Sequence, residues 1–228
     1  PAVGRRVRAL LLTATCALLA ACTSAAPDKP SVAGTSPARS PSPPPAAPKP
    51  ERAVGAPGAV ALYACKMAVS NPPPLAPDRR VIGATMRVNV KGVALRLAPV
   101  SEGCLSSGYG PRGSKQHRGV DYFARGGDVV AAGGGVIKEV ATRADFGNMI
   151  LIDHGAGVYT RYAHLASFAR AFAVGDKIKD GAVLGPIGAT GMAGAPHLHY
   201  EILSGAYVAG VGSFGLSQHD PFALLAAK

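Results

Sequence analysis

The first quarter of this 228-residue chain lacks the residues from which a folded core is built. No aromatic residue precedes Tyr63, and half of the 20 prolines fall between Pro27 and Pro57. A segment rich in proline, alanine and serine cannot bury enough apolar surface to offset the entropy of an ordered chain. We therefore expect residues 22–58 to form a disordered tether, which at about 3.1 Å per residue reaches on the order of 100 Å. A linker without an evolved length is the alternative.

The front of the chain also lacks an apolar run long enough to cross a membrane. Ala9–Ala21 is uncharged but has only 13 residues, whereas a spanning helix needs about 20. A short apolar run behind a cluster of arginines is typical of a signal peptide. Because the run ends at Cys22 in a pattern that resembles the lipobox of bacterial lipoproteins, we expect residues 1–21 to be removed and Cys22 to carry lipid. An ordinary secreted protein with an incidental Cys22 is the alternative.

Acidic residues are scarce, with 13 Asp and Glu against 24 Lys and Arg, which gives a formal net charge of +11. Removal of residues 1–21 would lower this charge to about +8. Such a charge favours anionic surfaces, for example phospholipid headgroups or cell-wall polymers. Solubility alone is the simpler explanation, and for an exported chain no nucleic-acid partner is expected.

Cysteines are few, and two of the four lie at the front of the chain. Cys16 would leave with the signal peptide and Cys22 would be lipidated, so Cys65 and Cys104 remain as an even pair in an oxidising compartment. We expect a disulfide between them. It would tie an N-terminal extension, residues 59–98, to the main domain, residues 99–228, and closing a loop of about 40 residues contributes about 3–4 kcal/mol in the loop-entropy model.

Helical periodicity is scarce in residues 99–228, and short β-branched or aromatic runs alternate there with glycines. Such runs predict a mainly β, antiparallel sheet domain. We expect strands within residues 136–140, 149–152, 158–164 and 197–202, a turn of helix over Leu165–Phe172 and a short terminal helix over Pro221–Lys228. The glycine clusters lack a following helix with Lys-Ser or Lys-Thr, which excludes a phosphate-binding loop.

Two short motifs concentrate side chains that bind metals. His117-Arg-Gly-Val-Asp121 is the first, and His197-Leu-His199 is the second. Residues two apart in a strand share a face, so His197 and His199 point into the same space, and His164 supplies a further imidazole. A catalytic zinc takes three protein ligands and an open position, which leaves two of the five groups for proton chemistry. Each motif alone is equally explained by separate structural histidines.

Taken together and in order, these motifs resemble the lysostaphin-type (LytM-like) zinc metallopeptidases. The resemblance covers about residues 99–222 and leaves the preceding segments uncovered. Its elements are Gly108-Tyr-Gly-Pro-Arg112, His117-Arg-Gly-Val-Asp121, Gly147-Asn, Asp153-His-Gly, Tyr162-Ala-His-Leu165, Val174-Gly-Asp176, Asp180-Gly, His197-Leu-His-Tyr-Glu201 and Asp220-Pro221. It implies a β-sheet domain with a zinc-binding groove, walled by loops that include residues 143–147 and 189–195.

The resemblance also implies a role for each group. His117, Asp121 and His199 would bind one Zn2+ per chain, which would activate a water and polarise the scissile carbonyl. His164 would act as general base and His197 would donate to the oxyanion, although the two roles are open to exchange.

Several further residues have two readings. Arg112 could bind substrate, but a salt bridge within the fold is at least as good an expectation. Glu201 could orient a ligand histidine, yet we expect it to point away from the face that carries His197 and His199. His154 is expected to have a turn or supporting role rather than to bind metal.

The function implied by the resemblance is a zinc-dependent endopeptidase that hydrolyses cross-links or stem peptides of bacterial peptidoglycan. Lipidation at Cys22 would anchor it to a membrane, on the periplasmic side of the outer membrane or otherwise at the bacterial cell surface. The alternative is a non-hydrolytic LytM-like binding module that activates a separate cell-wall amidase. Loss of a ligand would favour that alternative, and all three ligands are present in this sequence. The motifs do not indicate which peptide bond is cut.

Overall fold

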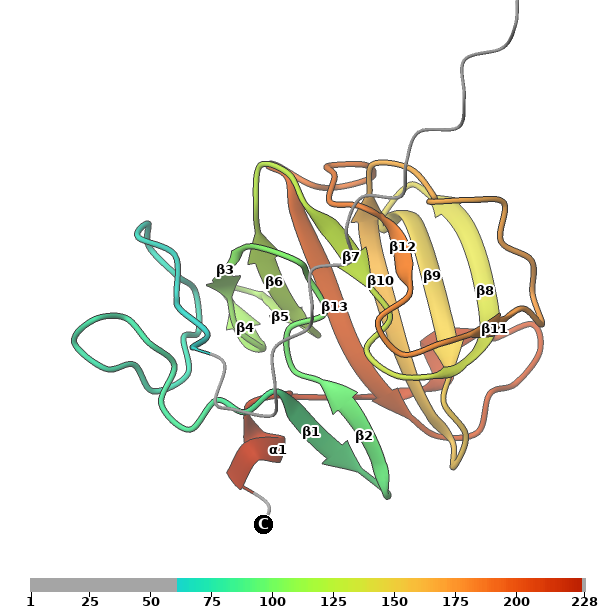
Figure 1. Ribbon diagram of the computed structural model, residues 1–228, viewed down its shortest axis with the longest axis horizontal. Coiled ribbons are helices and arrows are strands. Elements are labelled where there is room, and N and C mark those ends of the chain that lie inside the picture. The colour runs from blue at the N-terminus through green and yellow to red at the C-terminus, as the bar shows by residue number, and fades with distance from the viewer. Residues whose placement is uncertain (1–60, 227–228) are drawn as a thin grey trace, which may run out of the picture. The chain divides into compact units, whose positions relative to one another are not determined.

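The computed structural model describes residues 61–226 (Figure 1). The predictions of a signal peptide, a tether and a lipidated Cys22 concern residues that lie outside the described part of the chain. Within the described residues, no helix is both long enough and apolar enough to span a bilayer.

The mainly antiparallel β fold expected from the sequence is confirmed. An eight-stranded sheet has the order β11-β8-β9-β10-β13-β6-β3, and β14 pairs with the far end of β13. Figure 1 shows β13 running through the middle of the molecule, and its registers place it between β10 and β6. The strands are β3 (Cys104–Ser107), β6 (Val120–Phe123), β8 (Gly135–Arg143), β9 (Gly147–Asp153), β10 (Val158–Leu165), β11 (Lys177–Ile178), β13 (His197–Ser204) and β14 (Ser217–His219).

Three two-stranded pairs and two short helices complete the described structure. The extension forms a hairpin across a two-residue turn, Lys91-Gly92, where both residues have positive φ, as the favoured hairpin turns require. A terminal helix is present, but as a single turn. The pairs are β1 (Arg87–Val90) with β2 (Val93–Arg96), β4 (Gly110–Arg112) with β5 (Lys115–His117), and β7 (Asp128–Val130) with β12 (Val183–Pro186); the helices are η1 (Ser213–Gly215) and α1 (Ala223–Ala226).

The turn of helix expected over Leu165–Phe172 is wrong. Strand β10 continues through Leu165, and the chain that follows has no helical turn. Backbone amides of this segment bond to β12 instead: Ala166 N donates to the Pro186 carbonyl (3.0 Å) and Ala169 N to the Leu184 carbonyl (2.9 Å). Pairing with β12 satisfies the groups that a helix would have bonded internally.

The central sheet is buried on both faces. One face packs on the main core, which includes Val120, Tyr122, Tyr162, Leu198 and Tyr200. The opposite face carries a smaller cluster, which comprises Met149, Leu151, Tyr159, Ala163, Leu203 and Leu216. Because successive side chains alternate in a strand, residues adjacent in sequence contribute to different clusters.

The extension belongs to the main core rather than to a separate one. Leu62, Val81 and Leu95 are buried in it. Beside β3, backbone bonds join Cys65 N to the Leu105 carbonyl and Leu105 N to the Tyr63 carbonyl, both at 2.9 Å. The expected disulfide joins Cys65 to Cys104. The extension thus covers β3, which is an edge strand of the large sheet.

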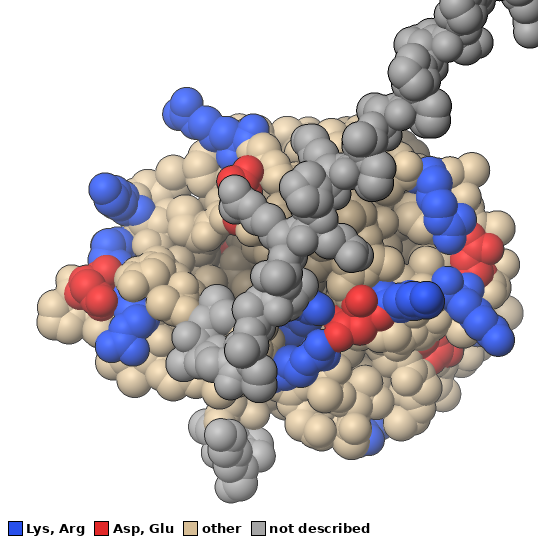
Figure 2. Space-filling model, viewed as in Figure 1, with Lys and Arg blue, Asp and Glu red and all other residues tan. Residues whose placement is uncertain are grey.

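Surface charges of opposite sign are interspersed. Asp180 pairs with Arg87 and with Arg96, the latter at 2.9 Å. Figure 2 shows Lys and Arg spread around the visible face, several of them beside Asp or Glu. On the described part of that face, this arrangement favours the interpretation that the charge serves solubility.

Candidate metal and catalytic site

Three neighbouring strands bring the predicted metal ligands together. His117 is the last residue of β5, Asp121 lies in β6 and His199 lies in β13. Asp121 and His199 are direct partners in the antiparallel register of β6 and β13. The alternation of β13 places His199 on the face of the smaller cluster, while its neighbours Leu198 and Tyr200 enter the main core.

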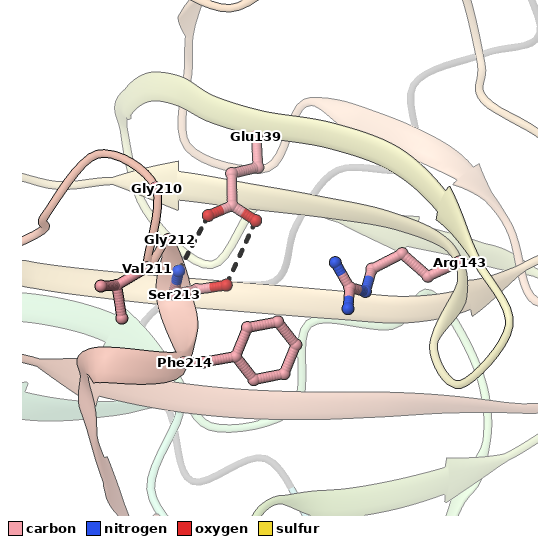
Figure 3. Close-up of a pocket in the computed structure, with 7 residues that line it drawn as sticks. All are labelled: Glu139, Arg143, Gly210, Val211, Gly212, Ser213 and Phe214. Atoms are coloured by element: carbon pink, nitrogen blue, oxygen red, sulfur yellow. Dashed lines mark hydrogen bonds between the residues drawn. The ribbon is translucent and has the colours of Figure 1, made fainter. Parts of the chain in front are cut away.

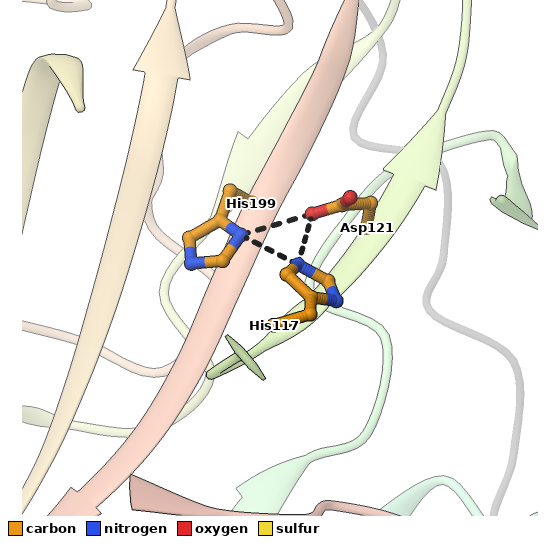
Figure 4. A group of neighbouring side chains, drawn as sticks. All are labelled: His117, Asp121 and His199. Atoms are coloured by element: carbon orange, nitrogen blue, oxygen red, sulfur yellow. Dashed lines mark hydrogen bonds and ion pairs between the residues drawn. The ribbon is translucent and has the colours of Figure 1, made fainter. Parts of the chain in front are cut away.

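One atom from each ligand converges on a single point (Figure 4). Asp121 Oδ1 lies 3.0 Å from His117 Nε2 and 2.9 Å from His199 Nδ1, and the two nitrogens are 3.1 Å apart. All three residues are buried. Ligands placed about 2.0–2.1 Å from a tetrahedral zinc stand roughly 3.3 Å from one another. The donor types and their spacing therefore fit one zinc ion.

Each histidine ligand is oriented through its other ring nitrogen. His117 Nδ1 lies 2.7 Å from the Gly108 carbonyl oxygen, to which its N–H donates. His199 Nε2 lies 3.0 Å from Glu201 Oε1. Such contacts fix the tautomer and leave the lone pair of the inner nitrogen directed at the metal.

Asp121 is held as a carboxylate. Burial alone would raise its pKa, but the imidazoles of His117 and His199, which donate hydrogen bonds to it when their inner nitrogens carry protons instead of a metal, outweigh burial and hold the pKa well below its ordinary value. Arg112 Nη2 donates to the outer oxygen, Oδ2, at 2.6 Å. Arg112 thus forms a salt bridge within the site, and its predicted contact with substrate stays a prediction.

The two histidines outside the triangle share a different arrangement. His164 Nδ1 lies 2.8 Å from the Thr190 carbonyl oxygen, and His197 Nδ1 lies 2.8 Å from that of Ala195. Their ring centroids are 4.7 Å apart, and His197 Nε2 is 3.8 Å from Asp121 Oδ1. Among the described residues, neither Nε2 has a hydrogen-bond partner. Both rings therefore keep one nitrogen free beside the metal triangle.

Backbone distortion brings His164 to this place. Simple alternation would put His164 on the core face with Thr160 and Tyr162. The register of β9 and β10 shifts between Tyr162 and Leu165, and His164 has φ 63°. A positive φ is strained for a residue with a Cβ. The shift turns the ring toward His197 and His199, whose centroids lie 4.7 and 6.0 Å away.

The loop of residues 189–195 supports both free histidines through its carbonyls. Gly147 lies against this loop with φ 60°, and a Cβ there would meet Thr190 atoms at 2.3–2.4 Å. Asn148 N donates to Thr190 Oγ1 (3.0 Å), which in turn donates to the Leu165 carbonyl (2.7 Å). The two predicted wall loops thus contact each other, and one of them positions the rings.

Two expectations about neighbouring residues have clear outcomes. Glu201 does not point away from His199 but contacts it, because positions 197, 199 and 201 share one face of β13. His154 uses both nitrogens, at 2.8 Å from the Gly134 carbonyl and 2.7 Å from Thr160 Oγ1, so both are engaged within the fold.

Sequence reasoning missed Arg161 and Phe146. Arg161 Nη1 donates to Glu201 Oε2 at 2.7 Å, and both side chains are 2% exposed. The Phe146 ring lies 5.8 Å from the ring of His199. A charged residue inside the otherwise uncharged run Val158–Leu165 was the available signal for Arg161.

Comparison with known proteins agrees with this geometry. The family model described as "Peptidase family M23" matches residues 115–210. The chain is 42% identical over 86 residues to "DD-carboxypeptidase/endopeptidase Mpg" of Neisseria meningitidis, an alignment that covers 37% of this chain and 19% of that protein. It is 36% identical over 118 residues to "Peptidoglycan DD-endopeptidase ShyC" of Vibrio cholerae, covering 48% and 27%.

A third relative, "Glycyl-glycine endopeptidase ALE-1" of Staphylococcus capitis, is 35% identical over 107 residues, covering 44% of this chain and 29% of that protein. The chain thus spans less than a third of the length of each of these three relatives.

Proposed function

Because residues 115–210 form a domain of peptidase family M23, we propose that this chain is a zinc-dependent endopeptidase that hydrolyses peptide bonds of bacterial peptidoglycan. The observation that carries the proposal is the buried triangle of His117 Nε2, Asp121 Oδ1 and His199 Nδ1 beside two histidines with free Nε2 atoms. This combination provides both a metal site and groups for proton transfer.

The three ligands and the two free histidines have separate roles in the proposed reaction. A zinc ion held by the three ligands supplies a Lewis acid for the scissile carbonyl and lowers the pKa of a bound water to about 7. Burial lowers the pKa of His164 to about 4, so its ring is neutral at neutral pH and its Nε2 accepts a proton. In this proposal, the neutral ring and the free Nε2 support His164 as the general base.

His197 takes the complementary role. Its Nδ1 proton is committed to the Ala195 carbonyl, and its Nε2 lies near Asp121. When Nε2 carries a proton, it donates to the negative oxygen that develops on the carbonyl during attack. The loop of residues 189–195 keeps both rings at the positions these roles require.

The substrate class follows from the relatives, and the individual bond stays open. The name of one relative specifies a DD-carboxypeptidase/endopeptidase, that of the second a peptidoglycan DD-endopeptidase, and that of the third a glycyl-glycine endopeptidase. The shared chemistry is hydrolysis of a peptide bond. A binding module that activates an amidase would need no free base, so the intact His164 and His197 favour hydrolysis.

Export and membrane attachment complete the proposal. We expect residues 1–21 to direct export, and lipid on Cys22 to anchor the chain to a membrane facing the cell wall. The support is the sequence pattern of Ala9–Cys22 and the tether composition of residues 22–58. Mass spectrometry of the N-terminal peptide from membrane fractions tests this part directly.

The deciding experiment is digestion of purified peptidoglycan sacculi. The purified chain is incubated with sacculi, with and without a zinc chelator, and the released fragments are identified by mass spectrometry. We expect chelator-sensitive release, and the new fragment ends name the bond. Absence of release by a protein that binds one zinc per chain would contradict the endopeptidase and favour the activating module.

A further inference from the structure

The face of the sheet that carries the metal ligands also contains a buried ion pair. Arg161 in β10 and Glu201 in β13 are direct register partners. Their side chains are each 2% exposed, and Arg161 Nη1 lies 2.7 Å from Glu201 Oε2. This pair lies next to His199, because Glu201 Oε1 is 3.0 Å from His199 Nε2.

Stability alone does not explain such a pair. Moving two charges out of water carries a desolvation penalty, and apolar residues of similar volume often serve the fold equally well or better. Two nitrogens of Arg161, Nε and Nη2, are buried without a hydrogen-bond partner among the described residues. Among the described residues, Arg161 thus leaves hydrogen bonds unmade while keeping one to Glu201.

Aromatic rings fix the guanidinium in place. The Arg161 Cζ atom lies 4.4 Å from the centroid of the Phe146 ring and 5.5 Å from that of Phe214. Phe146 also contacts His199, with ring centroids 5.8 Å apart. Figure 3 shows Phe214 in the wall of a cavity of about 300 Å3, opposite Glu139. The buried pair therefore lies between the sheet and the Phe146 ring, with the half-exposed Phe214 ring farther from the guanidinium.

A chain of contacts leads from this pair to the metal position. A carboxylate oxygen accepts hydrogen bonds, so the 3.0 Å contact with Glu201 Oε1 holds a proton of His199 on Nε2. His199 Nδ1 then presents its lone pair toward His117 Nε2 and Asp121 Oδ1, which lie 3.1 and 2.9 Å away. Carboxylates in this position orient metal-binding histidines and raise their basicity.

We propose that Arg161 and Glu201 form a positioning pair for the metal site, in which Glu201 fixes the tautomer and ring orientation of His199 and Arg161 compensates the charge of Glu201. This inference rests on the zinc site of the proposed function. The pair acts through His199 and touches neither metal nor substrate. It extends the metal centre by two residues, of which Arg161 lies in β10, a strand that supplies no metal ligand.

Zinc affinity tests the pair independently of hydrolysis. We expect Glu201→Ala to raise the zinc Kd, measured by competition with a chromophoric chelator, by about 10- to 100-fold. Glu201→Gln keeps an acceptor for His199 but removes the charge, so a smaller increase is expected. In the cobalt-substituted protein, both variants should shift the visible absorption bands, since the ligand field changes with His199.

A matched control separates positioning from folding. Tyr200→Phe alters the neighbouring residue on the opposite face and removes the bond from its hydroxyl to the Arg96 carbonyl (3.1 Å). It should lower thermal stability and leave the zinc Kd unchanged. If Glu201→Ala folds poorly, the double variant Arg161→Met with Glu201→Gln removes both charges, and we expect it to recover stability but not zinc affinity.

The outcomes are distinct for the two proposals. Parent-like zinc affinity and cobalt spectra in folded Glu201 variants would overturn the positioning pair, whatever their stability. Failure of the parent chain to bind zinc would instead contradict the proposed function. Weakened zinc binding in the variants, together with no hydrolysis by the parent, would support the pair and leave a metal-binding protein of another activity.

Discussion

The two faces of strands β6, β10 and β13 are both buried, yet they consist of different chemistry. The core face carries three tyrosines, whose hydroxyls bond to the backbone: Tyr122 to the Leu97 carbonyl, Tyr200 to the Arg96 carbonyl, and Tyr162 to Ala132 N. Burial raises the pKa of each, so they stay neutral. The site face carries six ionisable groups in the same strands, namely Asp121, Arg161, His164, His197, His199 and Glu201.

The difference shows how one sheet serves both stability and chemistry. On the core face, each tyrosine hydroxyl forms a hydrogen bond with the backbone. On the site face, charges compensate one another, but the partners are arranged so that three ligand atoms converge and two imidazole nitrogens stay free. Because successive side chains in a strand point to opposite faces, neighbouring residues contribute to the two different environments.

The largest effect should come from breaking the triangle. Asp121→Ala removes the charged ligand that both histidines contact, so we expect zinc content to fall from one per chain to near zero and hydrolysis of sacculi to fall to background. Metal analysis after dialysis and fragment release are the measurements. A variant that kept stoichiometric zinc would contradict the ligand assignment.

Removing a free nitrogen should separate chemistry from metal binding. His164→Ala leaves the three ligands intact, and loss of a general base typically lowers the rate about 10²–10⁴-fold. We therefore expect one zinc per chain with hydrolysis reduced by this factor. Unchanged hydrolysis would refute the catalytic assignment of His164.

An intermediate effect is expected from the loop that orients the free histidines. Gly147→Ala would place a Cβ within 2.3–2.4 Å of Thr190 atoms, which must displace the carbonyl bonded to His164 Nδ1. A misplacement of about 1 Å costs up to about 100-fold in rate. We expect hydrolysis to fall by about 10- to 100-fold while the zinc Kd stays near that of the parent. An equal loss of zinc affinity would show that the loop supports the ligands as well.

The smallest effect concerns the histidine on the core side. Burial lowers the pKa of His154, and its bond to the Gly134 carbonyl offsets this only in part. The unfolded chain then binds the proton more readily, so stability should fall as pH decreases below about 6.5, the ordinary histidine value. His154→Gln should flatten the dependence of Tm on pH between 5 and 6.5. An equally steep dependence in the variant would assign the titration to other groups.

The sequence predicted the metal-binding and catalytic positions more completely than the residues that hold them in place. Period-two spacing in β13 and the conjunction of short motifs predicted the five histidine and aspartate positions that the structure brings together. Glu201 was misplaced although the same spacing covers it. His164 reaches the site through a bulge and a positive φ, which alternation does not encode. Arg161 was missed because its importance depends on a partner 40 positions away.

The helical turn expected after β10 failed for a related reason. A short apolar stretch such as Leu165–Phe172 is compatible with either helix or extended chain, and its amides are bonded by β12, which comes later in the sequence. Local pattern therefore predicts a strand where alternation is long, as in β13, and loses power where distant strands supply the hydrogen bonds.

The extension along β3 has a consequence for handling the protein. An uncovered edge strand presents unpaired amides and carbonyls that recruit strands from other molecules. Residues near Tyr63 and Cys65 occupy these groups of Leu105, and the disulfide to Cys104 fastens them there. A chain shortened to residues 99–228 would retain every group of the metal site and still tend to self-associate into aggregates through β3. We therefore expect the extension to keep the edge of β3 from pairing with other molecules.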